Sequence, residues 1–166
     1  MRTRKIITTS ILSALSLVIF VLESQIPPLI PIAGVKLGLA NVVTLFAKVT
    51  LGTKYAFMVL MTKIFLGNFF AGSVVSFFYS LVGGVVCFFF ECLALRFMSN
   101  QQIWAVSIIG AVFHNIGQVL TACVLIGSSK IIWYLSILVP VGMVTGMFVG
   151  ICTMYTVKAF KKLRRE

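Results

Sequence analysis

The stretch IWAVSIIGAVFHNIGQVLTACVLIG, residues 103–127, decides the fold class, because it contains no Asp, Glu, Lys or Arg. An α-helix rises about 1.5 Å per residue, so a run of this length can cross the ~30 Å hydrocarbon core of a bilayer. The whole chain has the same character, since its 166 residues are 60% hydrophobic and only 10% charged. A soluble domain of this size cannot hide so much apolar surface from water. The sequence therefore predicts an integral membrane protein.

Similar apolar runs recur along the chain, separated by short segments with the Gly, Pro, Ser and Asn typical of turns. Backbone polar groups in lipid must be hydrogen-bonded within their own segment, so we expect each run to be helical. We predict a single all-α domain over residues 1–166, a bundle of six transmembrane helices. The second and third spans are short and are expected to tilt, to lie within the bundle or to be partly re-entrant. The runs cover residues 6–25, 37–51, 54–70, 73–96, 103–127 and 131–158.

The positive charges are unevenly distributed over the ends of these runs. The chain has 14 Lys and Arg against 3 acidic residues, a net charge of +11. With a cytoplasmic N-terminus, only Lys36 and Lys130 lie at external breaks. The positive-inside rule therefore predicts a multi-pass protein of the cell membrane with both termini cytoplasmic. We attribute the charge to topology and lipid headgroups, not to nucleic acid. The cytoplasmic cations are Arg2, Arg4, Lys5, Lys54, Arg96, Lys158, Lys161, Lys162, Arg164 and Arg165.

The chain lacks the residue patterns of several large enzyme classes. It contains no Asp, and three scattered Glu do not form a carboxylate cluster for Mg²⁺. Neither a GxxxxGK[ST] loop, a GxSxG elbow nor an HExxH pair occurs. The four Cys lie within apolar runs without a CxxC pair and are expected to pack as small hydrophobes. We therefore predict no catalytic residue, no metal site and no cofactor.

The segment PPLIPIAGVKLGLAN, residues 27–41, joins the first two spans. Its three prolines stop the first helix and place Lys36 at the start of the second, on the outer face. There Lys36 either contacts a bound anion or anchors the helix at the lipid headgroups. Asn41, Thr44 and Lys48 follow at helical spacing on one face. This polar stripe is expected to face a cavity or neighbouring helices.

Three further charged residues fall within or near the apolar runs. Lys63 lies near the middle of the third span, where an ammonium group is costly unless paired or hydrated. It either pairs with an acid inside the bundle or binds an anionic ligand. By depth, Glu91 is the better partner for Lys48, and Glu23 is the better partner for Lys36.

The fifth run carries HNIGQ, residues 114–118, near the middle of the membrane. His114 and Gln118 are one helical turn apart, and Asn115 is adjacent. These side chains either line a ligand site or hydrogen-bond to other helices. We also place Asn68, at the outer end of the third span, in this polar pocket. The predicted substrate-binding residues are Lys36, Asn41, Lys63, Asn68, His114, Asn115 and Gln118.

Small residues at four-residue spacing occur in the first and last spans. Such spacing lets helix backbones approach closely in lipid. Ser10 and Ala14 form one such pair, and Gly142, Gly146 and Gly150 form a double GxxxG. Two interpretations stay open: packing within this chain, or docking to a separate membrane subunit.

Two of these stretches carry a family resemblance. Residues 31–41 with Thr44 and Leu45, together with HNIGQ, resemble the Gx transporter family, also labelled heptaprenyl diphosphate synthase component I, over nearly the whole chain. Family members are similar to the S components of energy-coupling factor transporters, six-helix proteins that capture a small molecule from outside. The resemblance implies docking on a membrane coupling subunit driven by two ATPases. Ser10 and Ala14 resemble the Ala-xxx-Ala docking motif of S components, with Ser in place of the first Ala.

We therefore predict a non-enzymatic, membrane-embedded subunit that binds a small, anionic or amide-bearing substrate for a transporter. The alternative is a non-catalytic membrane component I of a heptaprenyl diphosphate synthase in isoprenoid biosynthesis. In that case a partner performs catalysis, because a prenyl transferase needs aspartate-rich motifs that this chain lacks. A scaffold for another membrane assembly is a third possibility, and it would contain no ligand pocket.

Overall fold

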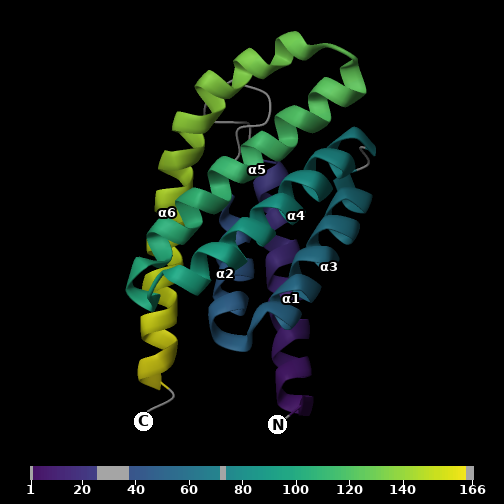
Figure 1. Cartoon of the computed structure of the whole chain (residues 1–166). Coiled ribbons are helices and arrows are strands. Elements are labelled where there is room, and N and C mark those ends of the chain that lie inside the picture. The colour runs from purple at the N-terminus through teal and green to yellow at the C-terminus, as the bar shows by residue number, and fades with distance from the viewer. Residues whose placement is uncertain (1, 26–37, 72–73, 164–166) are drawn as a thin grey trace.

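The computed structural model describes residues 2–25, 38–71 and 74–163, and the secondary structure of these residues is entirely helical (Figure 1). This confirms the prediction of an all-α protein. Two short 3₁₀ turns, η1 and η2, precede the last two α-helices. The elements are α1 (Arg2–Gln25), α2 (Leu39–Leu51), α3 (Thr53–Ala71), α4 (Val74–Phe97), η1 (Asn100–Gln102), α5 (Ile103–Ile126), η2 (Ser129–Tyr134) and α6 (Leu135–Leu163).

Among the described residues, four helical segments are long and apolar enough to cross a membrane. They are Thr3–Gln25, Val74–Phe97, Ile103–Ile126 and Ser129–Leu163. The apolar helix α2 has only 13 residues, which span about 20 Å at the usual helical rise. The start of α1 and the end of α6 lie at the same end of the bundle (Figure 1). The count of six spans and the cytoplasmic position of both termini stay predictions.

The helices form two groups of three along the chain. Helices α1, α2 and α3 pack against one another, whereas α5 packs against both α4 and α6. The two groups meet where α2 contacts α6 and where α3 contacts α4. Helix α2 is the most enclosed, because every residue from Val43 to Lys48 is buried.

The close packing of α5 against α6 depends on the glycines of the double GxxxG. A Cβ atom added at Gly150 would lie 2.5 Å from the Cα of Trp104, and one added at Gly146 would lie 2.7 Å from the Cβ of Ala111. Both distances are shorter than a van der Waals contact, so only glycine permits this approach. The interpretation that these glycines pack within the chain is confirmed.

The distribution of polarity is that of a protein in lipid. Large apolar side chains point outward, and Phe69, Val124 and Trp133 are each at least 79% exposed. In contrast, the charged side chains of Lys48, Lys63 and Glu91 are all buried inside the bundle. The interior of the bundle therefore holds the groups whose presence needs a structural or functional reason.

Candidate functional site

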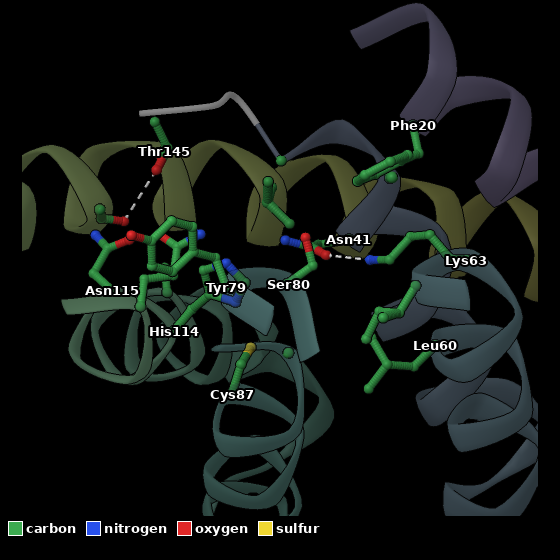
Figure 2. A pocket seen from close by; sticks show the side chains of 18 of the residues that line it. Phe20, Asn41, Leu60, Lys63, Tyr79, Ser80, Cys87, His114, Asn115 and Thr145 are labelled. Carbon is green, nitrogen blue, oxygen red and sulfur yellow. Dashed lines mark hydrogen bonds between the residues drawn. The ribbon is translucent and has the colours of Figure 1, made fainter. Parts of the chain in front are cut away.

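The buried polar groups gather around a cavity of about 330 Å³ between the two groups of helices (Figure 2). Each of the six α-helices contributes side chains to its wall. A volume of this size lies at the small end of the range for ligand pockets. Polar side chains in the wall are Glu23, Asn41, Lys63, Ser76, Tyr79, Ser80, Cys87, Glu91, Ser107, His114, Asn115, Gln118 and Thr145.

The cavity brings together five of the seven residues that the sequence nominated for substrate binding: Asn41, Lys63, His114, Asn115 and Gln118. The other two are not seen there. Asn68 is buried, but it does not line the cavity, and its side-chain amide donates to the Ile64 carbonyl at 2.8 Å. Lys36 lies outside the described residues.

One side of the cavity is formed by Lys63 and Asn41 (Figure 2). The Lys63 ammonium donates a hydrogen bond to Asn41 Oδ1 at 2.7 Å, which joins α3 to α2. Lys63 is only 5% exposed and forms no salt bridge among the described residues. A buried ammonium with a neutral amide as its partner is energetically unfavourable unless something further compensates the charge.

Helix α5 forms the opposite side, where His114, Asn115 and Tyr79 of α4 lie near one another (Figure 2). Asn115 is held in place because its amide donates to the Leu138 carbonyl of α6 at 2.6 Å. Gln118 is one turn further along α5, and its Oε1 atom is buried without a hydrogen-bond partner among the described residues. This side therefore combines a fixed amide with an unused buried acceptor.

Glu91, which lines the cavity, belongs to a buried ion pair. Lys48 of α2 forms a salt bridge with Glu91 of α4, and both side chains are almost fully buried. The Lys48 ammonium also donates to the Phe88 carbonyl at 3.2 Å and lies 3.7 Å from the centroid of the Phe88 ring. The Cys87 thiol donates to the other Glu91 oxygen at 3.6 Å. The predicted pairing of Lys48 with Glu91 is confirmed.

The polar stripe of α2 faces inward, as the sequence predicted. Asn41 lines the cavity, Thr44 is buried and Lys48 belongs to the ion pair. Glu23, near the end of α1, accepts a hydrogen bond from the backbone N–H of Gly38, directly before α2. Gly38 has a φ of 73°, a left-handed conformation that favours glycine. The expected pairing of Glu23 with Lys36 lies outside the described residues.

None of the residues nominated for substrate binding belongs to α4, yet this helix forms part of the cavity wall. Its cavity wall includes a stripe of small or polar residues spaced four, four, three and four positions apart, and Val75 and Tyr79 line the cavity beside it. This is the period of one helical face, so the signal was available in the sequence. The dense phenylalanines around the stripe obscured it. The stripe is Ser76, Ser80, Gly84, Cys87 and Glu91.

Ser10 and Ala14 lie elsewhere, on the exposed surface of α1. They line a groove between α1 and α3 that also contains Lys54, Tyr55 and Met58. The groove has a volume of about 580 Å³ and does not share residues with the cavity.

Comparison with known proteins returned one family. A profile described as heptaprenyl diphosphate synthase component I matches residues 12–156. Neither curated proteins nor solved structures gave a significant match.

Proposed function

This chain belongs to the heptaprenyl diphosphate synthase component I family, the family that the sequence resemblance named, and from this premise we propose that it is a substrate-binding subunit of a membrane transporter. In this role the cavity holds a small molecule, and separate coupling and ATPase subunits supply the energy. The observation that carries the proposal is the convergence of five nominated polar residues on a single cavity.

The proposal is supported by the free-energy cost of burying polar side chains inside a membrane protein. Lys, His, Asn and Gln side chains away from water need partners, and each unpartnered group costs several kcal/mol in the apolar interior, of order 2–7 for a neutral group. A bundle that served only as a scaffold would fill this volume with apolar side chains. Here Lys63 and Gln118 instead retain unfilled hydrogen-bonding capacity beside an open volume.

The groove on α1 and α3 supports a second part of the proposal, which is docking to a membrane coupling subunit. Ser10 and Ala14 are exposed there although small residues are favoured where helices meet in lipid. Replacing Ala14 with Trp should fill the groove and prevent co-purification of the coupling subunit and its ATPases. Val18→Trp is the matched control, because Val18 is exposed on the same helix and does not line the groove.

Substrate binding is tested by mass spectrometry of small molecules that remain bound through purification. Wild-type protein should carry a molecule that His114→Ala loses, while the variant still elutes as a folded protein. Phe89→Ala is the control, since Phe89 is 63% exposed and does not line the cavity. A wild-type protein that carries nothing and binds no added probe would remove the proposal.

The second candidate is a non-catalytic membrane subunit of a heptaprenyl diphosphate synthase, and the family description favours it. In this role the chain does not perform the transfer itself, because it has no Asp, and of its two cavity carboxylates Glu91 is paired with Lys48 and Glu23 accepts the Gly38 N–H. Co-purification separates the two candidates. A soluble prenyl synthase that accompanies the chain and loses activity without it would support the second and exclude the first.

A further inference from the structure

We propose that the molecule held in this cavity is a small organic acid, whose carboxylate or phosphate group binds Lys63 and whose other end offers an N–H or O–H donor to Gln118. This inference rests on the proposed function, since it names the class of molecule that the same cavity takes. It concerns Lys63 of α3 and Gln118 of α5, which both line the cavity.

Lys63 has no carboxylate in salt-bridge contact among the described residues. The chain contains three acidic residues. Glu91 is paired with Lys48, and Glu23 accepts the Gly38 N–H without forming a salt bridge to Lys63. Glu166, the third acid, follows the basic end of α6 and lies outside the described residues. No described carboxylate therefore forms a salt bridge with Lys63, and Glu23 and Glu91 act on its charge only from a distance.

The two buried lysines differ in the partners that surround their ammonium groups. Lys48 has a carboxylate, a carbonyl and an aromatic ring around its ammonium group. Lys63 is equally buried, yet its one hydrogen bond among the described residues goes to the amide oxygen of Asn41. An ammonium group has three N–H donors, so two of those on Lys63 have no hydrogen-bond partner among the described residues. The cavity adjoins Lys63, and a bound anion would fill both donors and supply the counter-charge.

Helix α5 contributes Gln118 to the cavity wall. Gln118 Oε1 is a buried acceptor without a partner among the described residues, and the side chain lines the cavity. Such an atom destabilises the empty protein until a donor reaches it. Lys63 can donate further hydrogen bonds and Gln118 Oε1 can accept one. The complementary molecule therefore carries an acceptor for Lys63 and a donor for Gln118. Asn68 Oδ1 is also unpartnered, but it does not line the cavity and therefore serves as a control.

Simple probes test the acid group on the full chain in lipid nanodiscs. Butyrate, its neutral amide butyramide and inorganic phosphate have comparable small sizes and differ in charge and acid type. We expect butyrate or phosphate to raise the unfolding temperature and butyramide to leave it unchanged. The more effective anion distinguishes a carboxylate from a phosphate site. Equal stabilisation by butyramide and the anions would overturn the acid assignment.

Variants of Lys63 test the residue. Lys63→Met should weaken binding of the effective anion about 10- to 100-fold, as loss of a charge-assisted hydrogen bond requires. Lys63→Arg retains the charge and should keep most of the affinity. If Lys63→Met does not fold, Lys63→Gln removes the same charge with a polar side chain. Asn68→Leu should bind like wild type.

Two outcomes separate this inference from the proposed function. A neutral or cationic molecule that co-purifies with wild type and with Lys63→Met would overturn the acid and leave the receptor role intact. A protein that carries no molecule and responds to none of the probes would overturn both.

Discussion

Replacement of Asn41 by Asp gives a stringent test, because it supplies Lys63 with a counter-charge by changing a single side-chain group. Asn41 Oδ1 already lies 2.7 Å from the Lys63 ammonium, so an aspartate in the same rotamer would form a salt bridge without rearrangement. The internal carboxylate would then imitate the acid group of the proposed ligand. We expect the empty protein to become more stable and to lose its affinity for acids.

The magnitude follows from the kind of hydrogen bond that is exchanged. The existing Lys63–Asn41 hydrogen bond already has one ionised partner and contributes about 1.5–3 kcal/mol, and an aspartate adds the Coulomb attraction of a second charge. Desolvation of the new carboxylate offsets part of this gain. A net gain of about 1 kcal/mol raises the unfolding temperature of a chain of this size by about 2–4 °C. Binding of butyrate or phosphate should weaken at least about fivefold, because the same free energy opposes it.

Thermal unfolding in nanodiscs, with and without these anions, measures both effects on the same sample. Asn41→Leu is the control, since it removes the amide without adding a charge and should lower the unfolding temperature of the empty protein. The reasoning is refuted if Asn41→Asp unfolds below wild type and still binds the anion with unchanged affinity. That pair of results would mean that the Lys63 charge is already compensated in the empty protein.

Three further predictions concern the packing around the cavity. Lys48→Met should lower the free energy of unfolding by about 3–5 kcal/mol, because it leaves Glu91 buried without its partner. In a double-mutant cycle, adding Glu91→Gln should restore part of this loss, whereas additive losses would show that the pair is not coupled. Gly150→Ala should lower the unfolding temperature more than Gly67→Ala. The new methyl group at Gly150 meets the α5 backbone at 2.5 Å, whereas the obstacle at Gly67 is the ring of Phe20, which can turn. Equal losses would contradict this. Asn68→Leu should leave stability unchanged or slightly higher, since it removes a buried acceptor that has no partner among the described residues, and a marked fall would show that this acceptor is satisfied.

Sequence reasoning succeeded where the physical constraint was strong. The uncharged stretch 103–127 became α5 at 103–126, because lipid leaves a long apolar run no alternative to helix. The partner of Lys48 was also predictable, since the chain offers few acids and only Glu91 matched its depth. The five cavity residues were nominated for the same reason, as uncompensated polarity inside the membrane must turn inward.

Asn68 does not line the cavity because of its position around α3. It lies five positions along the helix from Lys63, which turns the side chain about 140° around α3 and moves it more than one turn along. Asn68 therefore bonds to the backbone of its own helix. Similarly, the position of α4 relative to α5 depends on Gly83 and Gly117, whose close approach no single-sequence pattern specifies.

Helix α2 explains why two lysines of similar burial differ in chemical role. It is enclosed by α1, α3 and α6, so its 13 residues need not match the thickness of the bilayer, and its polar stripe contacts protein instead of lipid. Near its end, Lys48 meets the carboxylate of Glu91, and the resulting neutral pair holds the two groups of helices together. At its start, Asn41 offers Lys63 an amide, and no described carboxylate forms a salt bridge with Lys63 beside the cavity. The direct pairing of Glu91 with Lys48, and not with Lys63, therefore separates a structural contact from the proposed binding contact.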